Sequence, residues 1–150
     1  MTTAIGTELI EGYLRTRQVR YFRGHHDDEF FFLVNTYHGR LHVHLEPCGP
    51  AAKTVKISVT AERYYPIDQC DRVAALAQQW NNTGPRVSAL VFESSDPGLV
   101  GVVAESRFRT GEIEFGAFAD QAIQSAIELF ARMKASVGSA PDGGRLLDAS

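Results

Sequence analysis

Apolar residues recur every three to four positions in some segments of the chain and every second position in others. Helical spacing predicts amphipathic helices over about residues 4–17 and about residues 115–135. A further helix is predicted to begin at Asp68 or Asp71 and to end at the NNTGP stretch, residues 81–85. Either aspartate suits a helix N-terminus, because its carboxylate accepts hydrogen bonds from free backbone N–H groups. Three helices are therefore predicted.

Spacing of two residues predicts the strands. In residues 40–46, Leu41, Val43 and Leu45 share one face, and the polar side chains alternate with them. Residues 53–62 show the same alternation, and QVRYF (18–22) and FFFLVNTY (30–37) predict two earlier strands. After the second helix, RVSALVFES (86–94) is apolar on both faces, which predicts a central strand, and LVGVVAESRFR (99–109) predicts another.

The predicted order is α-β-β-β-β-α-β-β-α. Strands with one apolar and one polar face, joined by short turns, favour an antiparallel sheet with helices packed on one face, and hence an α+β fold. Residues 1–137 suit a single domain, and the small, polar and glycine-rich residues 138–150 predict a flexible tail.

Composition narrows the partners. The formal charge of −3 and the lack of a dense Lys/Arg cluster argue against nucleic-acid binding. No stretch approaches the ~20 apolar residues needed to cross a bilayer, and the N-terminus lacks a signal-peptide pattern, so we expect a cytoplasmic protein without membrane contact. In that compartment Cys48 and Cys70 are expected to be free thiols.

The known catalytic and phosphate-binding motifs are missing. The sequence contains no GxxxxGK[ST], GxGxxG, GxSxG or HExxH pattern. Cys48 lies in a Pro/Gly loop without features of an activated nucleophile. We therefore expect no enzymatic activity, no catalytic residues and no cofactor.

Four of the five histidines are candidate metal ligands. His42 and His44 share one face of a predicted strand with Glu46, while His25 and His26 belong to an HHDDE run (25–29). Two imidazoles and a carboxylate could bind a transition metal, but the spacing supplies few ligands, and alternation alone requires polar residues there. The HHDDE run likewise suits a turn. No metal is expected, and these four histidines are weak candidates.

The ordered set of motifs over about residues 5–135 resembles the YbjN family of bacterial proteins, proposed sensory transduction regulators. The resemblance rests on a helix ending in a Trp-Asn pair, then a proline, an Asp/Gly turn, an acidic strand residue and a last helix with an apolar-Phe segment. These features correspond here to Trp80, Asn81, Pro85, Asp96–Gly98, Glu105 and Ile127–Phe130. The resemblance implies a type III secretion chaperone-like fold, commonly dimeric.

The resemblance implies protein binding rather than chemistry. We expect a chaperone-like adaptor or regulator that binds another protein and forms a homodimer, and a metal or small-molecule sensor using the histidines is the alternative. Trp80 continues the apolar stripe of its helix and is expected in the core, whereas Asn81 and Asn82 are expected to cap the helix C-terminus. Phe115, Phe118 and Ile127 of the third helix are the expected partner-binding residues.

Overall fold

The computed structural model describes residues 5–24, 28–109 and 113–137. The helices are α1 (Ile5–Thr16), α2 (Cys70–Asn81) and α3 (Phe115–Val137), with 3₁₀ turns at Pro50–Ala52 and Ile67–Gln69. The strands are β1 (Phe22–Arg23), β2 (Phe30–Thr36), β3 (Gly39–Cys48), β4 (Thr54–Ala61), β5 (Tyr65–Pro66), β6 (Ser88–Glu93) and β7 (Leu99–Arg109). The predicted tail, His25 and His26 lie outside the described residues.

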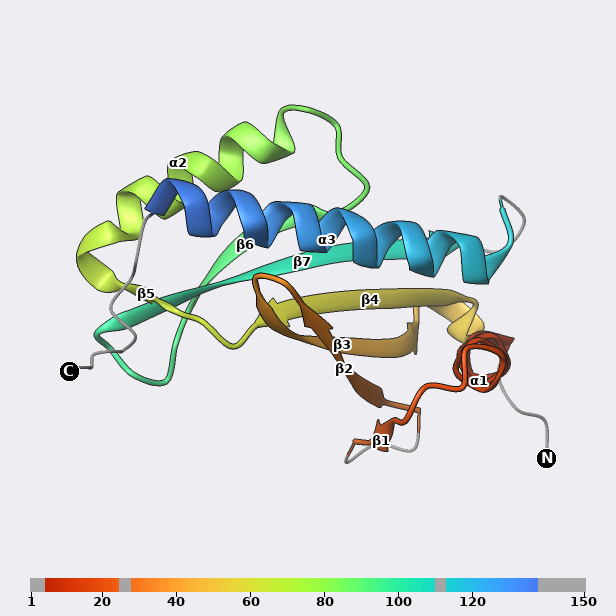
Figure 1. Ribbon diagram of the computed structural model, residues 1–150. Helices are drawn as coiled ribbons and strands as arrows, with labels where there is room; N and C mark the ends of the chain where they lie inside the picture. Colours follow the sequence, from red (N-terminus) through yellow and green to blue (C-terminus); the bar gives the residue numbers. More distant parts are fainter. Residues whose placement is uncertain (1–4, 25–27, 110–112, 138–150) are drawn as a thin grey trace.

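The strands form one antiparallel sheet (Figure 1). β1, β2, β3, β4 and β7 are neighbours in that order, and β6 pairs with the other edge of β7. The short β5 also pairs with β7, on the same edge as β4, because Val100 pairs with Tyr65 on one side and with Glu93 on the other. The α+β prediction and its antiparallel sheet are confirmed.

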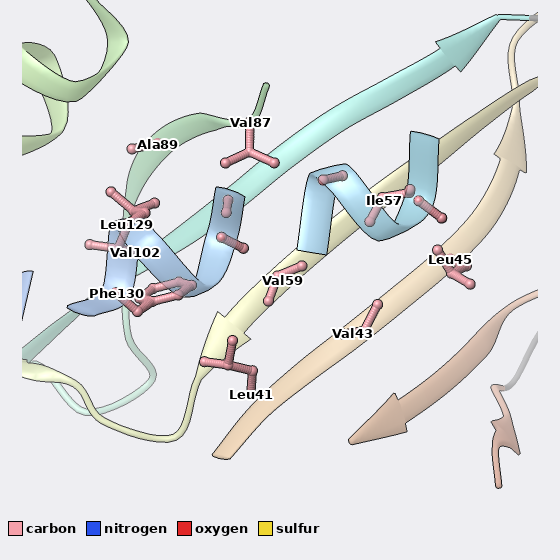
Figure 2. Packing of buried hydrophobic residues seen from close by; sticks show 14 of the residues in the cluster. Leu41, Val43, Leu45, Ile57, Val59, Val87, Ala89, Val102, Leu129 and Phe130 are labelled. Carbon is pink, nitrogen blue, oxygen red and sulfur yellow. The ribbon is translucent and has the colours of Figure 1, made fainter. Parts of the chain in front are cut away.

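The apolar face of the sheet carries the core. α3 lies across β4 and β7, α1 packs mainly against β3, and α2 packs against β6 and α3. In Figure 2, buried side chains of β3, β4 and β7 lie on the side of the sheet that α3 covers, with Val102 of β7 beside Leu129. Alternation along β3 and β4 accounts for this layer, because every second side chain points to the helices.

Two predictions about individual elements are wrong. β6 is an edge strand, not a central one, since β7 is its only partner among the described strands. Neither Asp68 nor Asp71 caps α2, because a 3₁₀ turn precedes it and its N-cap is Gln69, without a side-chain hydrogen bond. The strand predicted at residues 18–22 overlaps the observed β1, Phe22–Arg23, only at Phe22.

A tight turn joins β2 to β3, and the prediction of free thiols is confirmed. Gly39 has φ +133°, a conformation that L side chains rarely adopt, at the turn between β2 and β3. Cys48 and Cys70 are both free.

Candidate functional site

The face of the sheet opposite the helices is its open face, which carries the polar side chains of β3 and β4. The strand register aligns its side chains in rows that cross the sheet. One row contains Leu33, His42, Thr60, Val103 and Leu90, and the next contains Phe22, Phe31, His44, Ser58, Glu105 and Ser88. This open face therefore combines both predicted strand histidines with exposed apolar side chains.

His44 lies in a cluster of possible metal ligands with two glutamates. One ligand atom from each of Glu29, His44 and Glu46 lies within 4.8 Å of the others. The Nε2 atom of His44 is 3.3 Å from Glu29 Oε2. This nitrogen is buried, but it forms no hydrogen bond within the described part of the chain. The contact thus has the distance of an ion pair without the geometry of a hydrogen bond.

Close packing fixes the positions of these side chains. The ring of Phe31 stacks on that of His44, with centroids 4.6 Å apart and an interplanar angle of 17°. A Cβ atom at Gly24 would lie 2.6 Å from Glu29 Oε1 and 2.7 Å from the Phe31 ring. Only glycine therefore leaves room for both side chains at this point.

His42 belongs to a different group on the same face. Its Nε2 lies 3.2 Å from Glu62 Oε2, and Arg40 lies 3.6 Å from the same oxygen. A shallow hollow of about 550 Å³ connects His42 and His44 past the Ser58 and Thr60 hydroxyls. No hydrogen bond joins either hydroxyl to a histidine in the described residues, so no nucleophile–base pair is formed there.

The β6 edge of the sheet is covered by the end of α2. Asn81 donates a hydrogen bond from Nδ2 to the Ala89 carbonyl at 3.0 Å, and its Oδ1 accepts one from the Ala89 N–H at 2.8 Å. Trp80 donates from Nε1 to the Val87 carbonyl at 2.8 Å, and the residue is 6% exposed. The predicted burial of Trp80 is confirmed.

The role predicted for Asn81 is wrong. Its side chain pairs with a strand instead of capping the helix, since both polar atoms of the amide bond to Ala89. The helix end is closed instead by the backbone N–H of Asn82 and by the Thr83 hydroxyl, which donates to the Trp80 carbonyl at 2.7 Å. The Trp-Asn pair therefore acts as a unit that binds the edge strand.

The β2 edge has no comparable cover. β1 pairs only with Phe30 and Phe31, so residues 32–36 have no strand partner on their outer side within the described ranges. Leu33 is 43% exposed there, and β2 contains no charged residue and no proline. Charges and prolines are the usual devices that protect a strand edge from pairing with another chain.

The predicted partner-binding residues of α3 are mostly covered by the chain itself. Phe115 is 4% exposed and packs edge-on against Tyr13 and Phe108, so its ring is not available to a partner, contrary to the prediction. Phe118 is half-buried against Phe108. Ile127 is also half-buried and lines a pocket of about 450 Å³ between α3 and the ends of β3 and β4.

The remaining motif residues lie apart from one another. Phe130 is buried in the core, Glu105 lies on the open face between Ser58 and Ser88, and Pro85 is half-buried in the loop between α2 and β6. They do not converge on one site. Their common property is structural, because they belong to the elements around β6 and β7.

The clearest pKa shifts have structural causes. Burial, followed by the Asp120 hydrogen bond, raises the pKa of Tyr13. Burial alone would raise the pKa of Asp120, but hydrogen bonds from Arg17 and Tyr13 and the Arg17 charge together lower it. Burial raises the pKa of Tyr65 to about 12. These groups join α1 to α3 or lie in the core.

Comparisons with known proteins show the fold. No family model and no curated protein matches the chain, and none of the described helices is long and apolar enough to cross a membrane. The structure of YbjN from E. coli, a proposed transcription regulator, matches with a TM-score of 0.68 and 14% identity, over 90% of this chain and 96% of that one. An uncharacterised Methanothermobacter thermautotrophicus protein matches with a TM-score of 0.51 and 10% identity, over 89% and 100%. The chain has a YbjN-like fold.

Proposed function

We propose that this chain is a non-enzymatic, cytoplasmic protein-binding domain, an adaptor or regulator, that associates through the outer edge of β2. The observation that carries the proposal is the stretch of β2 at residues 32–36, which includes the exposed Leu33, carries no charge and has no strand partner on its outer side among the described residues. The likeness in fold to a proposed transcription regulator supports a regulatory role over a catalytic one.

An open strand edge favours a protein partner because of its main chain. It presents peptide N–H and C=O groups in a fixed row, and an extended strand from another protein supplies the matching row. Side chains such as Leu33 then add apolar contact on the open face. This surface replaces the third helix as the expected contact element, because the helix buries Phe115 in the core.

The occupant we propose is a second copy of the chain. Two β2 strands paired antiparallel about a two-fold axis near Val34 would place Leu33 opposite the partner's Asn35 and leave the pairing of β1 with Phe31 in place. No like charges would meet, since β2 carries none. The product is a homodimer with a sheet continuous across the interface.

The test is light scattering of the full chain with two matched variants. Leu33→Lys places a charge at the β2 edge, whereas Leu90→Lys places the same charge on the open face at β6, at a similar exposure of 45% against 43%. We expect a dimer for the wild type and for Leu90→Lys, and a monomer for Leu33→Lys. A wild-type chain that stays monomeric at high concentration refutes the dimer, and dissociation by Leu90→Lys alone places the contact elsewhere.

A further inference from the structure

We propose that Glu29, His44 and Glu46 form a binding site for a single first-row divalent cation, with Zn²⁺ as the best match. This site is separate from the proposed dimer edge. It lies where the segment entering β2 meets β3, since Phe30 pairs with Leu45 in the strand register.

The distances suit one shared ion. Zn²⁺ binds imidazole nitrogen at about 2.0–2.1 Å and carboxylate oxygen at about 2.0–2.2 Å, so two ligands in a tetrahedral arrangement lie about 3.4 Å apart. His44 Nε2 and Glu29 Oε2 are 3.3 Å apart, and all three ligand atoms lie within 4.8 Å of one another. Small side-chain adjustments are enough to bring the third ligand, Glu46, to the same ion.

The unsatisfied nitrogen of His44 is an independent observation. A buried polar atom without a hydrogen bond is rare in folded proteins and costs free energy. His44 Nε2 has no hydrogen bond in the described part of the chain, although its ring is held by Phe31 and faces two carboxylates. Coordination of a cation would satisfy the nitrogen.

The ligand set favours a borderline metal. One imidazole and two carboxylates suit Zn²⁺ better than Mg²⁺ or Ca²⁺, which prefer oxygen ligands only. Three protein ligands leave a fourth position for water, and the hollow of the open face reaches His44. Lys56 opposes binding, because its Nζ lies 3.5 Å from Glu46 Oε1 and competes for that carboxylate.

The experiment is calorimetric titration of Zn²⁺ into the full chain, purified without a histidine tag and stripped with a chelator. We expect one Zn²⁺ per chain. His44→Ala and Glu29→Gln should each weaken binding at least about tenfold. Lys56→Met should strengthen it, because the competing charge is gone. An excess of Zn²⁺ should also raise the Tm of the wild type, but not that of His44→Ala.

Two control variants make the result decisive. His42→Ala removes the neighbouring histidine of the same face, which pairs with Glu62 instead, and should bind Zn²⁺ as the wild type does. The double variant His25→Ala/His26→Ala should likewise retain the site. Circular dichroism of the metal-free variants verifies that each is folded. Absence of Zn²⁺ binding, or binding that depends on His25 and His26 or on His42 but not on His44, overturns the proposal.

Discussion

The two edges of the sheet differ in how they are protected. At β6, one asparagine amide takes the place of a neighbouring strand by bonding to both backbone groups of Ala89, and Trp80 bonds to Val87 beside it. At β2, residues 32–36 include no charged residue and no proline. Within the described residues, neither a strand nor a hydrogen-bonding side chain covers the outer side of this stretch. The fold therefore covers the β6 edge with side-chain hydrogen bonds and leaves residues 32–36 of β2 without a strand partner on their outer side in the described part of the chain.

Replacing Trp80 should break the closed edge with the largest effect. Trp80→Ala removes a buried ring and its bond to Val87, and also the contact with Arg132, whose guanidinium lies 5.2 Å from the ring centroid. We expect a loss of about 3–5 kcal/mol in the free energy of unfolding, measured by urea denaturation. Trp80→Phe keeps most of the burial and should lose clearly less. Equal losses for the two variants would mean that the hydrogen bond, not the ring, dominates.

Replacing Asn81 should open the β6 edge while leaving the helix in place. Asn81→Ala deprives both backbone groups of Ala89 of their partner, which should cost about 1–2 kcal/mol of unfolding free energy. The matched control is Asn82→Ala. The Asn82 side chain is exposed and forms no hydrogen bond with the residues that the structure describes, so its loss should change stability by less than about 0.5 kcal/mol. The open edge should also make Asn81→Ala self-associate at high concentration, which light scattering would detect.

Replacing Asp120 tests how firmly α1 is held over β3, one strand away from the open edge. Asp120 accepts hydrogen bonds from Tyr13 at 2.8 Å and Arg17 at 2.6 Å, and its pKa is lowered in the folded state. The lowered pKa stabilises the fold above the unfolded value of about 3.9, and this contribution is lost as the pH falls through the folded pKa.

Because the Arg17–Asp120 pair is about half exposed, the effect should stay below about 1 kcal/mol. Asp120→Asn should accordingly be slightly less stable than the wild type at pH 7, and the difference should shrink near pH 3. Urea denaturation at the two pH values measures it. A difference that grows at low pH would contradict the assigned sign.

The smallest effect on folding should come from the β2 edge itself. In Leu33→Lys the substituted side chain is already 43% exposed, so the unfolding free energy of the monomer should change by less than about 0.5 kcal/mol. Denaturation at a concentration below dimerisation measures it. A large loss would show that Leu33 supports the monomer, and the loss of dimer in this variant could then no longer be assigned to the edge.

Periodicity predicted which segments form strands better than it predicted which strands lie side by side in the sheet. Alternation along β3 and β4 gave the inward and outward side chains correctly, and the strand predicted at residues 99–109 matches β7. β6 was misplaced because apolar residues on both faces do not distinguish a central strand from an edge strand. Leu90 is 45% exposed on the open face, and the edge position depends on pairing that the local pattern does not encode.

The candidate metal site was only half predictable, for the same reason. Alternation places His44 and Glu46 on one face of a single strand, as predicted. Glu29 was assigned to a turn, because its approach to His44 depends on the pairing of β2 with β3. The role of Asn81 was hidden similarly, since a helix-terminal asparagine has the same sequence pattern whether it caps the helix or binds a strand.

The Trp-Asn pair also limits the length of the loop between α2 and β6. Trp80 bonds to Val87, seven residues later, and Asn81 bonds to Ala89, eight residues later. The two donor side chains belong to adjacent residues at the end of α2. Inserting or deleting a single residue within 82–86 would shift both backbone partners out of reach together. Apart from Thr83, which bonds to Trp80, and Gly84, whose φ of +68° disfavours L side chains, this short loop should tolerate substitutions better than changes of length, and distant relatives should share its spacing more reliably than its other residues.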